Sequence, residues 1–302
     1  MEAVILAAGK GTRMHSQLPK VLHTIGNKPM LAHVIDSAES AGARKIHIIV
    51  GNDGEQVKDQ ILNSASQVEV SWVIQKEQLG TAHAVLQAVP YFETKAQDDH
   101  ILVLYGDVPL IKPDTLRQLL ASTRADAIGI LTLITKNNKG LGRILRNESN
   151  DVIGIVEEKD ASDLQKEIKE VNSGIMALPV ARLESWLNRV ENNNQQSEYY
   201  LTDIIGLAVS EKVAINSVVV INEIEAQGVN DKSQLALVER HFQMTKCTQL
   251  LEEGVILKDP SRTDIRGELS CGNGVEIDFN TLFEGSVMLG DNVKIGPNTI
   301  IK

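Results

Sequence analysis

The feature that most limits how this chain can fold is a six-residue period that begins after Gly254. Two columns of apolar or small residues recur at every sixth position, and Asn or Ser recurs at one turn position on the same period. This period predicts a parallel β-helix, because each repeat supplies one short strand and stacks on its neighbour. The first column is Ile265, Cys271, Ile277, Phe283, Leu289, Ile295 and Ile301; the second is Thr263, Leu269, Val275, Thr281, Val287, Val293 and Thr299; the turn position holds Asn280, Ser286, Asn292 and Asn298.

The repeat region is short for a structure of this kind. One coil closes after three hexapeptides, and stacked repeats need roughly three units to be stable. Residues 265–302 supply about two coils and stop within the pattern, with no atypical capping repeat. We therefore expect the sequence to be a shortened version of a longer protein.

Short apolar runs alternate with amphipathic segments through the first two-thirds of the chain. Most of these runs are nearly continuous in apolar residues, as in strands buried on both faces. Strand, helix and strand in succession predict right-handed crossovers and a mainly parallel sheet, the α/β class. The expected strands are residues 4–8, 46–50, 68–74, 101–105, 127–135, 151–156, 171–178 and 213–220; the expected helices are 29–41, 54–65, 81–92, 181–191, 200–210 and 232–253.

The composition excludes several classes of protein. With 30 basic and 40 acidic residues the formal net charge is −10, whereas a chain that coats nucleic acid needs a basic excess. Aromatic residues make up 3% of the chain, which leaves few platforms for stacking bases. The cysteines Cys247 and Cys271 form neither a disulfide framework nor a paired metal-ligand motif. No signal peptide and no apolar stretch of roughly 20 residues is present, so we expect a cytoplasmic protein without a membrane span.

The first expected strand runs into a glycine turn surrounded by cations. Small residues at such a turn let backbone N–H groups approach an anion, and Lys10, Arg13 and Lys20 add positive charge. A dinucleotide fingerprint fits poorly, because Met14 occupies the position of its third glycine. The Gly-Lys-Gly-Thr order also differs from a P-loop. The turn therefore predicts an anion site of another type.

The motifs of the chain resemble the sugar-phosphate nucleotidyltransferase family. Together with the hexapeptide region, they are similar to its bacterial bifunctional members, the N-acetylglucosamine-1-phosphate uridylyltransferase/glucosamine-1-phosphate N-acetyltransferases (GlmU family). The matching segments span the whole chain in the family's order. They are Leu6-Ala7-Ala8-Gly9-Lys10-Gly11-Thr12-Arg13-Met14 with Pro19-Lys20, Gln75 with Gln78-Leu79-Gly80-Thr81, Tyr105-Gly106-Asp107-Val108-Pro109-Leu110, Gly142-Arg143-Ile144, Ile155-Val156-Glu157, Asn172-Ser173-Gly174, Glu198-Tyr199-Tyr200-Leu201-Thr202-Asp203 and Gly228-Val229-Asn230.

The resemblance implies an enzyme that joins UTP and N-acetylglucosamine 1-phosphate into UDP-N-acetylglucosamine and releases pyrophosphate, with Mg²⁺ as cofactor. The product would serve cell-wall peptidoglycan and lipopolysaccharide synthesis. It also implies a Rossmann-like nucleotidyltransferase domain over residues 1–230, a linker helix over 231–253 and the start of a left-handed parallel β-helix over 254–302. Family members trimerise through the β-helix, so a homotrimer is expected of the full-length protein. The acetyl-CoA site of the family lies further along that β-helix, and we expect acetyl transfer to be missing from this chain.

By the same resemblance, the backbone from Leu6 to Gly9, including Ala7 and Ala8, would hold the nucleotide and its phosphates. Arg13 and Lys20 would be the catalytic cations, and Lys20 would also bind substrate. Without the resemblance, both could be solvated surface charges. Uracil would be recognised by Gln75, Gly80 and Thr81, since an amide both donates and accepts along a base edge; alone, Gln75 could be a polar residue at a strand end.

Asp107 follows the expected strand 101–105, at the edge where open α/β sheets bind their ligands. The resemblance makes Asp107 and Asn230 the ligands of Mg²⁺, an ion that prefers oxygen donors, and makes Tyr105 and Gly106 substrate contacts beside them. Asp107 could instead be a turn residue before a proline, and Asn230 could cap the helix that follows.

The contacts to N-acetylglucosamine implied by the resemblance are Gly142, Glu157 and Asn172. Glu157 can accept hydroxyl protons, and Asn172 can both donate and accept. Taken alone, Glu157 belongs to a charge run of the kind usually found on a solvated face. Tyr200 and Thr202 could line the same pocket or support the helix that they begin.

Other functions stay open at this point. The chain could form an ADP- or dTDP-sugar, although the glycine-loop sequence and the 75–81 stretch favour uridine. It could also be a non-catalytic nucleotide-sugar-binding regulatory subunit, against which Arg13, Lys20 and Asp107 argue by their joint presence. A dehydrogenase is the most distant alternative.

Overall fold

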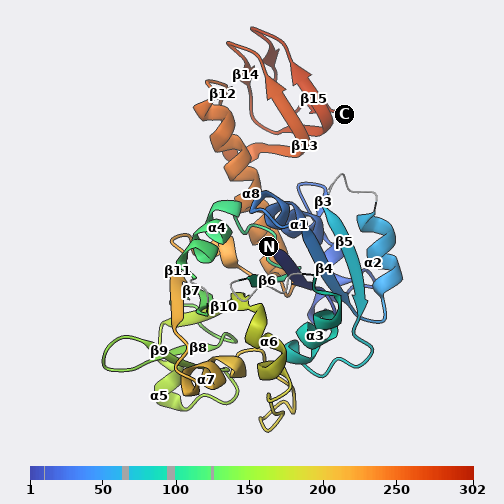
Figure 1. Cartoon of the computed structure of the whole chain (residues 1–302). Helices are drawn as coiled ribbons and strands as arrows, with labels where there is room; N and C mark the ends of the chain where they lie inside the picture. Colours follow the sequence, from blue (N-terminus) through green and yellow to red (C-terminus); the bar gives the residue numbers. More distant parts are fainter. Residues whose placement is uncertain (10, 63–67, 94–98, 124–125) are drawn as a thin grey trace. The chain divides into compact units, whose positions relative to one another are not determined.

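The computed structural model describes residues 1–302 except residues 10, 63–67, 94–98 and 124–125 (Figure 1). The chain divides into two compact units. Unit 1 comprises residues 1–22 and 31–228, and unit 2 comprises residues 23–30 and 229–302. The domain limits expected from the sequence stay a prediction, and the two units are described separately below.

Unit 1 is built on a mixed, largely parallel sheet. Within the part of the chain that the structure describes, this sheet has nine strands, with the order β11-β7-β10-β6-β1-β4-β5, and β8 and β9 pair beside β10. Strands β1, β4, β5 and β6 run parallel to one another, whereas β10 is antiparallel to both β6 and β7. The strands are β1 (Glu2–Leu6), β4 (Lys45–Val50), β5 (Glu69–Ile74), β6 (His100–Tyr105), β7 (Ile128–Ile134), β8 (Arg143–Arg146), β9 (Val152–Val156), β10 (Glu170–Pro179) and β11 (Ile215–Val219).

Both faces of this sheet are buried, which explains the continuous apolar runs. Along β1, Ala3 and Ile5 belong to the core on one face, and Val4 belongs to the core on the other. Side chains of α1, α2 and α4 pack in the first core, and those of α3, α6 and α7 pack in the second. The α-helices of this unit are α1 (Met30–Ser40), α2 (Gly54–Ile61), α3 (Thr81–Ala88), α4 (Pro113–Ser122), α5 (Asp163–Lys166), α6 (Val180–Leu187) and α7 (Asp203–Ser210).

The α/β class with a mainly parallel sheet is confirmed, and most elements lie within a few residues of their expected positions. The helix expected over 200–210 is shorter, because residues 200–202 form a turn and α7 begins at Asp203. The sequence analysis missed α4, α5 and β8. Strand β8 has only four residues, too few for a clear alternation of apolar side chains.

Unit 2, which the structure describes throughout, combines α8 (Lys232–Glu252) with two three-stranded parallel sheets, ordered β12-β14-β16 and β13-β15-β17. The register pairs residues 18 positions apart between β13 and β15, β14 and β16, and β15 and β17, whereas β12 pairs with β14 at a spacing of 20, as in Ile256 with Glu276. The core contains Ile265, Ile277, Phe283 and Leu289 of the first six-residue column, Val275 of the second, and side chains from α8. The strands are β12 (Ile256–Leu257), β13 (Thr263–Cys271), β14 (Glu276–Ile277), β15 (Thr281–Leu289), β16 (Lys294–Ile295) and β17 (Ile300–Ile301).

Three of the four expected turn residues have the left-handed backbone that favours Asn. Their φ angles are 57° at Asn280, 58° at Asn292 and 58° at Asn298. Ser286 is different, because it lies inside the nine-residue strand β15 beside Gly285. The parallel strands and their register are compatible with the expected β-helix, which remains a prediction.

The hairpin of β2 (Thr24–Ile25) and β3 (Lys28–Pro29) belongs to unit 2, where it packs against α8. Gly26 has φ 56°, and its amide donates to Glu239 Oε2 at 2.8 Å. An added Cβ at Gly26 would meet the Phe242 ring, so this close approach requires glycine. None of the described helices is both long and apolar enough to cross a membrane.

Candidate functional site

Four parallel strands of unit 1 bring their carboxyl ends to one edge of the sheet. In register, Leu6 at the end of β1 pairs with Ile49 of β4 and with Tyr105 of β6. The Ala7 amide continues this pairing by donating to Ile49 O at 2.8 Å, and the Gly106 amide donates to Leu6 O at 3.0 Å. The chain segments expected to bind nucleotide therefore leave the sheet side by side, where open α/β sheets bind ligands.

The glycine turn after β1 is held open and close to Lys20. Gly11 has φ 58°, and a Cβ added there would lie 2.8 Å from Lys20 Cβ. Only glycine combines that backbone with so close an approach. Gly9 is exposed and has no atom within 4 Å of an added Cβ, so a ligand can approach its backbone. Lys10 lies outside the described residues.

Lys20 forms an ion pair with Asp107: its Nζ donates to Asp107 Oδ2. Each side chain is only 13% exposed, so the pair is screened less than a surface ion pair. The contact brings the expected catalytic lysine to the expected metal-ligating carboxylate. It also makes the end of β6 a position that already attracts a cation.

Gln75 continues the sheet edge on the side of β5. Its backbone N–H donates to Val50 O at 2.8 Å. Its side chain is buried, and Nε2 lies 3.1 Å from both Gly80 O and His83 Nδ1. The side-chain nitrogen of Gln75 is thus engaged within the protein. Gln78 Nε2, from the same segment, donates to Ala8 O at 2.5 Å and links this segment to the glycine turn.

Gly80 permits a second close approach, to the backbone of Tyr199. With φ 122°, an added Cβ at Gly80 would lie 2.5 Å from Tyr199 O and 2.6 Å from Tyr199 N. The Tyr199 amide donates to Leu79 O at 2.8 Å, and the Ala82 amide donates to Tyr199 O at 2.9 Å. The expected uracil segment is therefore fixed against a segment that lies far away in the sequence.

Thr81 and Thr202 extend this link to Glu157. The Leu201 amide donates to Thr81 Oγ1 at 2.9 Å, and Thr202 Oγ1 donates to Glu157 Oε1 at 2.9 Å. Tyr200, between them, is buried, and its hydroxyl makes no hydrogen bond of normal geometry to the described residues. Burial, reinforced by Asp160 and other nearby carboxylates, raises the pKa of Tyr200 to about 12.

A series of contacts connects the remaining expected sugar-binding residues with Tyr105. An added Cβ at Gly142 would lie 3.4 Å from both carboxylate oxygens of Glu157. The Asn172 amide donates to Gly142 O at 2.8 Å, and Asn172 Oδ1 accepts from the Gly174 amide at 3.0 Å. Gly174 has φ 86°, and an added Cβ there would lie 2.5 Å from the Tyr105 ring. These contacts place Glu157, Gly142 and Asn172 together and tie them to the end of β6.

Glu157 sits in an acidic environment. Burial raises its pKa from the ordinary value of 4.5, Asp160 and Glu198 raise it further, and the Thr202 hydroxyl lowers it. Asp203 follows the same trend: burial, then Glu157 and Asp160, raise its pKa to about 6. We call Glu157, Asp160, Glu198 and Asp203 the acidic side of the site. We call residues 6–20 together with residues 105–107 the loop side.

The sequence analysis missed a residue that shapes the acidic side. Arg143 is 1% exposed, and its guanidinium donates to Glu158 Oε2, to Leu141 O and, at 3.4 Å, to Lys166 O. These contacts hold the chain on both sides of Glu157. Arg143 stood in a matching motif, but a lone arginine in a sequence gives no sign that it will be buried.

The two remaining expected residues are Arg13 and Asn230. Arg13 lies in an exposed 3₁₀ turn, Thr12–Met14. Asn230 belongs to unit 2, where its amide donates to Gln234 Oε1 at 2.6 Å. The cap of α8 is the neighbouring Asp231, whose side chain accepts from the Gln234 amide. The alternative of Asn230 as the helix cap is therefore wrong.

Among the described residues, no group of three or more His, Cys, Asp or Glu side chains is arranged to hold a metal ion. A magnesium ion that keeps phosphate and water oxygens needs only one or two protein carboxylates. Asp107, whose carboxylate already faces a cation, fits such a site.

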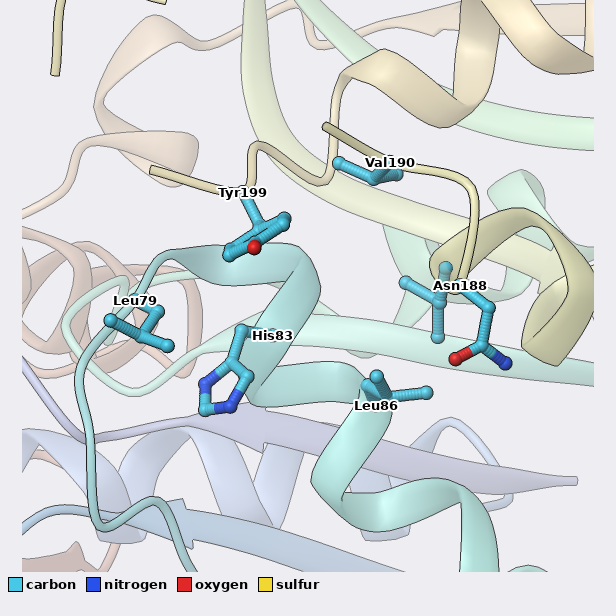
Figure 2. A pocket seen from close by; sticks show the side chains of 7 residues that line it. Leu79, His83, Leu86, Asn188, Val190 and Tyr199 are labelled. Carbon is cyan, nitrogen blue, oxygen red and sulfur yellow. The ribbon is translucent and has the colours of Figure 1, made fainter. Parts of the chain in front are cut away.

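A separate apolar pocket of about 230 Å³ lies beside α3, where His83 and Leu86 face Tyr199 and Val190 (Figure 2). Its other lining residues are Leu79, Leu187 and Asn188. None of the expected site residues lines it, so it is not the candidate site, although Leu79 and Tyr199 border both.

The comparisons with known proteins agree with this architecture. The chain is similar to the crystal structure of UDP-glucose pyrophosphorylase complexed with UDP-glucose, with a TM-score of 0.61 and 18% sequence identity over 72% of this chain and 89% of that one. At this identity the likeness shows a shared fold. A family model for the MobA-like NTP transferase domain matches residues 3–167, more than half of the 302 residues. The chain is therefore a member of the MobA-like NTP transferase domain family.

Proposed function

We propose that this nucleotidyltransferase moves the uridylyl group of UTP onto N-acetylglucosamine 1-phosphate, forming UDP-N-acetylglucosamine and pyrophosphate. The observation that carries the proposal is a continuous set of contacts among segments that are distant in sequence. Gln78 contacts the glycine turn, and the neighbouring Gly80 and Thr81 contact residues 199–201. Thr202 then contacts Glu157. Contacts among residues 142–174 connect Glu157 with Tyr105, two residues before Asp107. In this proposal, the turn for the phosphates, the amide for the base and the carboxylates for the sugar hydroxyls lie along this set of contacts.

The chemistry needs positioned charge more than a protein base. A sugar-phosphate oxygen attacks the α-phosphorus of UTP, one P–O bond forms, and the bond to the departing pyrophosphate breaks. The attacking oxygen is already anionic near neutral pH, so the protein's contribution is alignment and offsetting charge on the phosphates. In this proposal Lys20 and Arg13 carry that charge, and the backbone of residues 6–9 donates N–H groups.

The surroundings of Glu157 favour a sugar ring over a second phosphate on the acidic side of the site. A partly buried carboxylate beside Asp160 and Glu198 repels anions and accepts hydrogen bonds from hydroxyl groups. Gly142 lies close to that carboxylate, and the amide of the buried Asn172 donates to Gly142 O. We assign these three residues to the sugar ring.

Mg²⁺ would be held by Asp107 and substrate phosphates, and it would offset charge that develops on the leaving pyrophosphate. The chain's own part is the Asp107 carboxylate, presented at the end of β6 and balanced by Lys20. Asn230 remains a predicted second ligand.

Unit 2 supports the finer proposal that the chain contains the beginning of a left-handed β-helix. The 18-residue register between β13 and β15 equals three hexapeptides, and side chains of both columns belong to the core. We propose that the full-length protein uses such a domain to trimerise and to acetylate glucosamine 1-phosphate.

The proposal is tested by a pyrophosphate-release panel that pairs UTP, ATP, dTTP and CTP with the 1-phosphates of N-acetylglucosamine, glucose and glucosamine in the presence of Mg²⁺. We expect UTP with N-acetylglucosamine 1-phosphate to give the highest kcat/KM. A higher value for ATP or dTTP would assign the chain to an ADP- or dTDP-sugar. Nucleotide-sugar binding without any turnover would indicate a regulatory subunit.

A further inference from the structure

Four consecutive residues, 199–202, contact both halves of the proposed site. We call this segment the 199–202 bridge. It forms a turn between the residue 191–198 loop and α7, and Tyr200, Leu201 and Thr202 are all at most 7% exposed. Because buried, closely packed segments transmit displacements instead of absorbing them, the bridge can relate events at its two ends.

The first end of the bridge is fixed to the uracil segment. Tyr199 exchanges two backbone hydrogen bonds with that segment, to Leu79 O and from the Ala82 amide. Gly80 between them touches the Tyr199 backbone. The Leu201 amide adds a third hydrogen bond, to Thr81 Oγ1. A base that reorders residues 79–82 must therefore move the bridge.

The second end is fixed to the acidic side. Thr202 Oγ1 donates to Glu157 Oε1 at 2.9 Å. Upstream of the bridge, the Gln195 amide donates to Asp160 Oδ1 at 3.0 Å, while Asp160 Oδ2 is buried without a hydrogen-bond partner among the described residues. Displacing the bridge thus changes the hydrogen bonding of the carboxylate assigned to the sugar.

We propose that the 199–202 bridge couples the two substrates, so that nucleotide bound at residues 75–81 strengthens the binding of sugar phosphate at Glu157. Thr81 and Thr202 are the positioning residues: Thr81 acts through Leu201, and Thr202 acts through Glu157. The inference rests on the proposed function, since it requires both substrates to bind this site. By linkage, sugar phosphate strengthens nucleotide binding by the same factor.

The charges around Glu157 give the coupling a second readout. The groups that act on Glu157 or are acted on by it are Asp160, Glu198, Asp203, Tyr105 and Tyr200, all acidic or neutral. Among the interactions on Glu157, the Thr202 hydroxyl favours the ionised form and lowers the pKa. Loss of that hydroxyl raises the pKa of Glu157, so the acid limb of sugar-phosphate binding moves to higher pH.

The test measures binding of N-acetylglucosamine 1-phosphate by calorimetry, with Mg²⁺ and with or without saturating α,β-methylene-UTP, which cannot release pyrophosphate. The proteins are the wild type, Thr81→Val, Thr81→Ser and Thr202→Val. Thr123→Val is the matched control, because the Thr123 hydroxyl donates to Leu120 O at the end of α4. Coupling factors between sites are typically about 5–150-fold.

We expect at least fivefold coupling in the wild type and in Thr123→Val, and less than about twofold in Thr81→Val and Thr202→Val. Thr81→Ser keeps the hydroxyl and should restore most of the coupling. Thr202→Val should also shift the acid limb upward. Circular dichroism checks folding, and if Thr81→Val does not fold, Thr202→Val decides.

Three results separate the failures. Wild-type protein that binds neither ligand overturns the proposed function. Wild-type protein that binds both ligands independently overturns the coupling and leaves the proposed function standing. Full coupling in folded Thr81→Val would show that the bridge is a structural element only. If Thr81→Val does not fold, full coupling in folded Thr202→Val would show the same.

Discussion

The loop side and the acidic side of the candidate site differ in charge and in construction. On the loop side, Asp107 forms an ion pair with Lys20. The segments of this side lie at the ends of adjacent parallel strands. The acidic side gathers four carboxylates, and the pKa of Glu157 is raised by burial and by its acidic neighbours. Its carboxylates come from residues 157–160 and 198–203, two segments joined by single hydrogen bonds such as Thr202 to Glu157.

This contrast matches the two ends of the proposed reaction. Phosphates need cations and N–H donors, which a sheet edge and a glycine turn supply with little long-range organisation. A hydroxyl-rich ring needs acceptors, and clustering them costs stability because like charges are brought together. The four predictions below challenge this contrast, in order of decreasing effect.

Asp107→Asn should have the largest effect, because it removes the charge that holds a cation at the end of β6. We expect kcat/KM for pyrophosphate release to fall by about 10³-fold, and Mn²⁺ binding, measured by electron paramagnetic resonance, to weaken. Glu148→Gln, an exposed charge removal on the same unit, is the control. Wild-type Mn²⁺ affinity in Asp107→Asn would remove Asp107 from the metal site.

Lys20→Met should lower kcat/KM by about 10²-fold, as expected when one charge-offsetting group is lost. Its effect on metal binding should be opposite to that of Asp107→Asn. Because Lys20 and a metal ion share the Asp107 carboxylate, removing the lysine should leave Mn²⁺ affinity unchanged or higher. Weaker Mn²⁺ binding than in the control Lys136→Met would indicate that the lysine supports the metal instead of competing with it.

Glu157→Gln should separate function from stability. Folding raises the pKa of Glu157, so the free energy of unfolding decreases as the pH rises from the ordinary pKa of this carboxyl through the raised one. The ionised form of Glu157 therefore destabilises the folded protein at neutral pH. We expect Tm to rise by about 1–3 °C and the KM for sugar phosphate to rise about tenfold, with the KM for UTP nearly unchanged. A lower Tm together with an unchanged sugar-phosphate KM would contradict both assignments.

Asp160→Asn should have the smallest effect, a shift in pH dependence. Sugar-phosphate affinity should fall as the pH drops through the raised pKa of Glu157, because the ionised form is the better acceptor of hydrogen bonds from the sugar hydroxyls. Asp160 raises that pKa, so its neutral replacement should move the acid limb to lower pH. Comparing variant and wild type at each pH removes the titration of the substrate itself. If the pH at which sugar-phosphate affinity falls is the same in the variant and the wild type, Asp160 does not affect the pKa of Glu157.

The predictability of the fold follows the same division. The parallel half of the sheet was clear from the sequence, since its strands are buried on both faces and their apolar runs are uninterrupted. Strand β8 and helix α5 were missed because four-residue elements carry no measurable period. In unit 2 the six-residue columns indicated which side chains form the core.

The site was predictable only as far as residue types and motifs reach. Lys20 and Asp107 were expected, but their ion pair depends on side chains 87 positions apart. Gly80 was expected to contact uracil, whereas its most constrained contact is with the Tyr199 backbone. Arg143 and the 199–202 bridge act through burial and tertiary hydrogen bonds, which no local pattern encodes.

The most direct test of the central claim is ³¹P NMR of the purified chain with UTP, N-acetylglucosamine 1-phosphate and Mg²⁺. We predict that the UTP and sugar-phosphate signals decline together while those of UDP-N-acetylglucosamine and pyrophosphate appear in equal amounts. Unchanged spectra with UTP, together with turnover when ATP or dTTP replaces it, would contradict the assignment of a uridylyltransferase.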